Sequence, residues 1–152
     1  MKKTIIKSLF LSILFSFSAY SYDKPYLELG LGVEYGGLGS QIHIPIEIDD
    51  IDLFIAVGIF PESAIKTGDS AYGLGLSYYA SKNNTFNFYG GVIDQERYID
   101  SSFETRSKSE YGFSVGYKYY FNGYNKSGVV IGATINSNGD KTYPFVTIGY
   151  RY

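Results

Sequence analysis

His43 is the single histidine of the 152-residue chain and the first residue to consider for acid–base chemistry. A hydrolytic site needs a nucleophile within reach of that histidine. Ser40 stands three positions away, so in a strand the two side chains point to opposite faces. The positions two away hold Gln41 and Pro45, and neither is a nucleophile. The spacing favours a structural histidine, and we predict no catalytic residue.

Metal and cofactor chemistry find little support in the composition. The chain has no cysteine, which excludes a thiolate metal site, and one histidine is too few for a histidine-based one. We predict no metal-binding and no cofactor-binding residue. The remaining ionisable side chains of interest share the polar face of the strands described next: Glu28, Glu34, His43, Glu47, Lys118 and Arg151.

Apolar and polar residues alternate with a period of two in eight stretches, which is typical of strands. They cover residues 27–35, 41–48, 53–60, 71–79, 85–92, 111–120, 129–136 and 145–152. Stretches of this length suit tilted membrane strands, and eight strands close a small barrel. The sequence predicts an all-β fold, an eight-stranded antiparallel up-and-down transmembrane β-barrel. Antiparallel closure would bring Arg151, near the end of the last strand, close to Glu28 in the first.

Glycine placement indicates which face points inward. Among the glycines of the alternating stretches, only Gly90 falls on the apolar face. The polar face carries Gly30, Gly32, Gly58, Gly73, Gly75, Gly91, Gly112, Gly116, Gly132 and Gly149. The interior of an eight-stranded barrel is narrow and needs small residues, while glycines on a solvated face would only weaken the sheet. We expect the polar face inside and residues such as Leu74 and Ile131 in hydrocarbon. The alternative is a soluble barrel with its apolar face inward, as in lipocalins.

Aromatic residues on the apolar face gather at the strand ends. Tyr35, Tyr72 and Tyr111 stand at the ends expected outside; the periplasmic ends carry Tyr78, Phe86, Tyr117, Tyr119, Tyr150 and Tyr152. Two aromatic girdles around an aliphatic band are typical of membrane barrels. Short periplasmic turns are predicted at residues 49–52, 80–84 and 122–127, and outside connections at 36–40, 61–70, 94–109 and 137–141.

Residues 1–21 have the layout of a secretory signal peptide. A basic start with Lys2, Lys3 and Lys7 precedes an apolar run, and Ala19 and Ser21 occupy the −3 and −1 positions of a cleavage site. A retained anchor helix is the alternative. Cleavage leaves residues 22–152 as the barrel domain, with 10 basic and 15 acidic residues and a net charge of −5. That balance offers no basic patch for nucleic acid.

The signal peptide, the eight strands and the closing alternation of Val146, Ile148, Tyr150 and Tyr152 resemble the small outer-membrane barrels: OmpX, Ail-type proteins and the OmpA transmembrane domain. The resemblance covers residues 22–152. It implies an outer-membrane location, contact with outer-membrane lipids and lipopolysaccharide, and reading of those four residues by the outer-membrane insertion machinery. The family most often ends in Phe, so Tyr152 is a departure. The sequence stops at this strand, so we expect no peptidoglycan-binding domain like that of full-length OmpA.

The connection from Asp94 to Ser109 carries charges of both signs and partial alternation, which could extend the flanking strands as a projecting hairpin with residues 100–102 at its tip. Similar projections in OmpX/Ail-like proteins contact host or surface ligands; a solvated loop without a partner is the alternative. We expect a structural or surface-adhesive outer-membrane protein with a filled core. The competing functions are a small channel and a lipid A-modifying enzyme, although resemblance to lipid A deacylases would require His and Ser two apart on one strand.

Overall fold

The computed structural model describes residues 25–46, 48–60, 69–99 and 105–152. The expected signal peptide at residues 1–21, Glu47, and residues 61–68 of an expected outside connection lie outside the described residues. Within the described ranges, no helix is long and apolar enough to cross a membrane.

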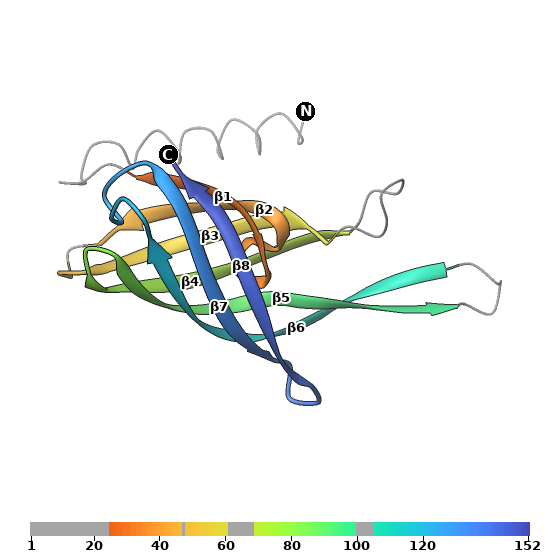
Figure 1. Ribbon diagram of the computed structural model, residues 1–152. Coiled ribbons are helices and arrows are strands. Elements are labelled where there is room, and N and C mark those ends of the chain that lie inside the picture. Colours follow the sequence, from red (N-terminus) through yellow and green to blue (C-terminus); the bar gives the residue numbers. More distant parts are fainter. Residues whose placement is uncertain (1–24, 47, 61–68, 100–104) are drawn as a thin grey trace, which may run out of the picture.

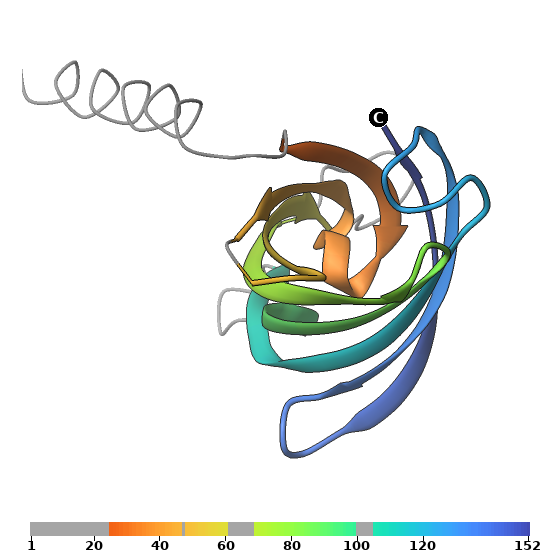
Figure 2. The same cartoon turned by 90° about the vertical axis from the view of Figure 1, so that its left-hand side faces the viewer.

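The described chain forms a closed barrel of antiparallel strands (Figure 1). In order, these are β1 (Tyr26–Gly32), β2 (Gly37–Pro45), β3 (Ile51–Ile59), β4 (Ser70–Ser81), β5 (Asn84–Ile99), β6 (Thr105–Tyr120), β7 (Gly128–Ser137) and β8 (Thr142–Arg151), with a 3₁₀ helix η2 (Val33–Tyr35) after β1. Each strand pairs with the next, and β1 pairs with β8 to complete the ring seen end-on in Figure 2. The predicted all-β, eight-stranded up-and-down barrel is confirmed.

The alternation places the two faces as expected. In β4, Leu74 is 57% exposed on the outer surface, whereas Gly73 and Gly75 on either side of it are buried. Gly75 lies opposite Phe54 and Tyr89 in the register of the neighbouring strands. A side chain at position 75 would meet Phe54 Cε1 at 2.5 Å, so the small residue is required by an inward-pointing ring. The polar face therefore lines the lumen, the interior of the barrel.

The connection between β1 and β2 departs from the prediction. Val33 and Tyr35 were expected on the outer face, with Tyr35 in an aromatic girdle, but both are buried in the lumen. The strand ends at Gly32, the chain then turns through η2, and Gly36 terminates this helix. The φ of Gly36 is 73°, in the left-handed region that glycine favours. The orange turn lies within the ring of strands in Figure 2. The connection thus folds inward and fills the barrel, and β2 begins at Gly37, within the stretch expected to be a loop.

The fifth and sixth strands extend well beyond their neighbours. The last β4–β5 pair joins Gly73 to Gly91, and the first β6–β7 pair joins Phe113 to Ser137, whereas β5 and β6 stay paired out to Ile99 and Thr105. The predicted projecting hairpin is confirmed for the strands and stands clear of the barrel in Figure 1; its expected tip at residues 100–102 lies outside the described residues.

A register shift follows Val92 at the base of this hairpin. Val92 was expected on the outer face, but both Val92 and Ile93 are buried. A bulge sets an extra residue against the partner strand and interrupts the alternation, so the period-two pattern does not carry through this point.

The short turns between β2 and β3, β4 and β5, and β6 and β7 lie at the other end, which we call the turn end. The connection at residues 121–127 agrees with the prediction. The turn predicted at 49–52 is too long, because β3 begins at Ile51 and Asp52 is a buried strand residue opposite Pro45 and Ser77.

Candidate functional site: the ionic network of the lumen

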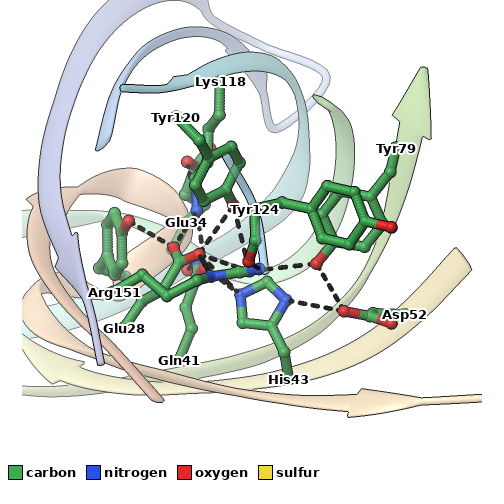
Figure 3. A network of polar contacts seen from close by, with 11 residues as sticks. Glu28, Glu34, Gln41, His43, Asp52, Tyr79, Lys118, Tyr120, Tyr124 and Arg151 are labelled. Atoms are coloured by element: carbon green, nitrogen blue, oxygen red, sulfur yellow. Dashed lines mark hydrogen bonds and ion pairs between the residues drawn. The ribbon is translucent and has the colours of Figure 1, made fainter. Parts of the chain in front are cut away.

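Glu28 is the centre of a polar network that crosses the lumen (Figure 3). Its Oε1 accepts hydrogen bonds from Arg151 Nε at 2.7 Å and Tyr120 OH at 2.7 Å. Its Oε2 accepts from Tyr35 OH at 2.8 Å and Lys118 Nζ at 2.9 Å. The carboxylate is fully buried, so its charge is stabilised by these two cations and two phenols rather than by solvent.

Arg151 holds Glu28 from β8. Its Nη2 lies 2.6 Å from Glu28 Oε1, and the two residues are direct partners in the β1–β8 register. The expected proximity of Arg151 and Glu28 is confirmed. The guanidinium also lies over the rings of Tyr120, Tyr26 and Tyr79, at 4.6, 5.1 and 5.6 Å from their centres. Arginine suits this position because a planar guanidinium both forks to a carboxylate and stacks on aromatic faces.

Lys118 connects Glu28 to the inward-folded turn. Its ammonium donates to Gln41 Oε1 at 2.7 Å, lies 3.3 Å from Glu34 Oε1 and lies 4.4 Å from the ring centre of Tyr35. Gln41 Nε2 in turn donates to the backbone carbonyl of Glu34 at 2.7 Å. The β1–β2 turn is therefore fastened to β2 and β6 by polar contacts inside the barrel.

His43 belongs to the same network. Its Nε2 lies 3.1 Å from Gln41 Oε1, the oxygen that already accepts from Lys118, so Nε2 carries the proton of that contact. The other ring nitrogen lies 4.0 Å from Asp52 Oδ2, and Nε2 lies 3.6 Å from Glu28 Oε1. The ring also packs on Phe54 at 5.2 Å between centres. The imidazole is thus placed between two carboxylates.

No serine is placed for His43 to activate among the contacts of the described residues. Ser40 pairs with Leu29 and Val57 on the outer side of the wall, and its hydroxyl donates to the Val57 carbonyl at 3.4 Å. His43 is fully buried on the opposite face of the same strand. The part of the chain that the structure describes also contains no group of three or more His, Cys, Asp or Glu side chains suited to a metal ion.

Apolar clusters lie on both sides of the network. Toward the hairpin, Val33, Phe54, Ala56, Tyr89 and Ile93 pack together, with Tyr143 against them. Toward the turn end, Tyr79, Tyr120 and Val130 form a second cluster with Tyr124. The polar network and the two clusters therefore fill the lumen of the described barrel. Glu28, Glu34, Lys118 and Arg151 are fully buried there or nearly so, and Asp52 is 6% exposed.

Of the expected inward residues, Glu28, Glu34, His43, Lys118 and Arg151 meet in this network, and Glu47 lies outside the described residues. Two members of the network were not expected in the lumen: Asp52 was predicted in a turn, and Tyr35 was predicted on the outer face. Tyr79 OH donates to Asp52 Oδ2 at 2.5 Å, which ties the two strands behind His43. The position of Tyr79 and Tyr120 on the polar face was a usable signal for their inward role.

The outer surface is the reverse of the lumen. Its most exposed aliphatic and aromatic side chains include Phe113 at 75%, Val146 at 73% and Ile135 at 61%. Tyr72 and Tyr111 form one exposed aromatic pair on this surface, with their hydroxyls 2.9 Å apart.

The chain matches no model of a known protein family, no curated protein and no solved structure.

Proposed function

We propose that this chain is an outer-membrane β-barrel protein with a closed lumen, exported with its signal peptide and serving a structural or surface-adhesive role. The observation that carries the proposal is the reversed polarity of the barrel wall. Along one strand, buried Glu28 alternates with Leu27 and Leu29, which are 39% and 42% exposed. A soluble barrel places its apolar residues inside, whereas a lipid-embedded barrel places them outside.

The aromatic and aliphatic residues of the outer face support the same proposal. Tyr78, Tyr117 and Tyr150 are exposed near the turn end, and Leu74, Val115 and Ile148 are exposed between the two ends. Aromatic rings suit the headgroup region and aliphatic side chains the hydrocarbon. In this proposal the turn end faces the periplasm and the hairpin faces outward.

The closed lumen favours a structural role over a channel. The buried side chains of the two clusters and the hydrogen-bonded groups around Glu28 occupy the lumen of the described barrel. An eight-stranded barrel has room for its own side chains and little else. The projecting hairpin is the part best placed for a surface partner, since Tyr98 and Glu96 are exposed on strand segments that pair only with each other.

Membrane fractionation and heat-modifiable migration test the proposal directly. We expect the expressed chain to lose residues 1–21, to sediment with outer membranes and to migrate differently on gels before and after boiling. Recovery as a soluble periplasmic protein would contradict it.

The adhesive role has a separate test. Bacteria that display the wild-type chain are compared, for adherence to epithelial cell monolayers, with bacteria that display a barrel whose residues 94–109 are replaced by a short Gly-Ser turn. We expect lower adherence for the shortened barrel at equal surface amounts. Equal adherence would contradict the adhesive role, and only the structural role would remain.

A further inference from the structure

A cavity of about 510 Å³ lies at the turn end of the barrel, and we call it the turn-end cavity. Volumes of about 300–1,000 Å³ are typical of ligand sites. Its lining includes three tyrosines and three aspartates: Tyr26, Tyr79, Tyr124, Asp49, Asp50 and Asp52. The Tyr124 ring stacks on Tyr79 at 4.0 Å between centres (Figure 3). Aromatic faces and carboxylates together favour a cationic occupant.

The charge of the turn-end cavity is negative. Asp49 and Asp50 are exposed in the β2–β3 connection, and Asp52 is buried in β3. None of the described residues that line the cavity is a lysine, arginine or histidine. Arg151, which lies over two of the tyrosine rings, is already paired with Glu28. The cavity is therefore complementary to a cation from outside the described barrel.

The chain itself carries such cations directly before β1. Residues 22–24 read Tyr-Asp-Lys, and one residue separates them from Tyr26, whose ring lines the cavity. Cleavage after Ser21 creates an α-ammonium at Tyr22 beside the ammonium of Lys24. These two positive charges stand against one carboxylate, so the segment has a net positive charge.

We propose that residues 22–24 of the mature chain bind in the turn-end cavity, with their ammonium groups against its three aspartates. The inference rests on the proposed export with signal-peptide cleavage, because only cleavage creates the α-ammonium. In the uncleaved chain the same nitrogen belongs to an uncharged peptide bond. Processing thus supplies a charge that the folded barrel is built to receive.

The register of the neighbouring strands leads this segment to the cavity. Tyr26 pairs with His43, so the same antiparallel pairing continued backward sets Lys24 opposite Pro45. Pro45 is in turn opposite Asp52 in β3. Alternation gives Lys24 the same side of the strand as Tyr26. Four extended residues reach about 13 Å, more than the roughly 10 Å of two strand spacings from β1 to β3.

Covalent attachment favours this occupant over a free cation. A short tether holds its binding group at an effective concentration in the millimolar range, so even weak ion pairs at the cavity suffice to keep the segment bound. The bound segment would cover the tyrosine rings at the end of the barrel that faces the periplasm in the proposed orientation.

Zero-length cross-linking tests the contact. The full chain is expressed and purified in detergent micelles, and its intact mass shows whether residues 1–21 have been removed. A carbodiimide then joins amines to carboxylates that touch, and mass spectrometry of the digest locates the links. We expect links from Tyr22 N or Lys24 to the aspartates of the cavity. Lys126, exposed in the β6–β7 connection at the same end, is the control and should form none with them.

The outcomes separate the two proposals. Retention of residues 1–21 would contradict the proposed export, and the inference with it. A processed, heat-modifiable barrel without these links would overturn the inference alone. Links from residues 22–24 of one chain to the aspartates of another would identify a second copy as the occupant and would also overturn it.

Urea unfolding of the processed barrel gives an independent measure. Lys24→Gln should lower the unfolding midpoint, whereas Lys126→Gln should leave it unchanged. In a chain that carries Asp49→Asn and Asp50→Asn, Lys24→Gln should cause a smaller loss, because two partners of the ammonium have been neutralised. Equal midpoints for Lys24→Gln and Lys126→Gln would refute the binding of the segment.

Spermidine distinguishes the chain's own segment from a free organic cation. We expect added spermidine to raise the midpoint of Lys24→Gln more than that of the wild type, whose cavity the segment already occupies. Equal protection of both proteins would show a cavity open to external cations and would overturn the proposal.

Discussion

The lumen and the outer face of the barrel are built from the same strands with opposite chemistry. Glu28 is fully buried and ion-paired, while its neighbour Leu29 is 42% exposed. In β6, buried Lys118 stands between Tyr117 and Tyr119, which are exposed. The inward face is specific, since each charge has a named partner; the outward face needs only to be apolar. The stability of the barrel should therefore depend far more on residue identity inside the lumen than on the outer face.

The largest effect is expected from the loss of a buried charge. Arg151→Ala leaves Glu28 in the lumen with one of its two cations removed, and breaking a buried pair costs about 3–5 kcal/mol of unfolding free energy. Lys141→Ala is the control, because the Lys141 side chain is 58% exposed and its ammonium lies 3.9 Å from Glu110, a surface pair worth under about 1 kcal/mol. Urea titrations measure both variants. Equal midpoints would show that the lumen pair contributes nothing beyond a surface pair.

The next effect concerns the outer face alone. Leu74→Arg puts a charge in the middle of the apolar surface, and if that surface meets lipid the cost is roughly 2–4 kcal/mol. Leu74→Ile keeps the surface apolar and should be nearly silent. Folding yield into lipid bilayers measures both. A barrel that accepts arginine at position 74 without loss would argue against a lipid-facing surface.

The same substitution, Tyr→Phe, compares the two faces at one inward and one outward tyrosine. Tyr35→Phe removes the hydrogen bond from the buried phenol to Glu28, and a bond to a charged group is worth about 1.5–3 kcal/mol. Tyr72→Phe removes a contact with Tyr111 on the outer surface, where both rings are more than half exposed, and no measurable change is expected. A larger loss of unfolding free energy for Tyr72→Phe than for Tyr35→Phe would contradict the comparison.

The smallest effect comes from two glycines on opposite faces. Gly75→Leu forces a side chain against Phe54 and the Phe88 carbonyl, 2.5 Å from the position of its Cβ, and such overpacking costs about 1–3 kcal/mol. At Gly90, a Cβ would meet only the Phe113 ring, at 3.6 Å, so Gly90→Leu should be tolerated. Thermal unfolding in detergent compares them. A harmless Gly75→Leu would mean that position 75 does not face a packed lumen.

Much of the fold and part of the site could be read from the residue pattern. Period-two alternation assigned Glu28, Lys118 and Arg151 to the lumen, and antiparallel closure brought Arg151 next to Glu28. The period-two alternation gave wrong predictions where the chain leaves the regular strand. At Val92 a bulge shifts the register, and at Asp52 a charged residue looked like part of a turn although its carboxylate is held inside by Tyr79.

The sequence by itself determined the number of strands, the face of most strand residues and the charge pairing across the closing strands, because pleat geometry ties side-chain direction to position along a strand. Only the tertiary structure decided the direction of the β1–β2 turn. Tyr35 packs where Gly30 and Gly149 carry no side chain: a Cβ at either would lie 2.8 and 2.6 Å from its ring carbon and hydroxyl. That space exists only once β1 and β8 have closed the barrel, so no local pattern around Tyr35 could reveal it.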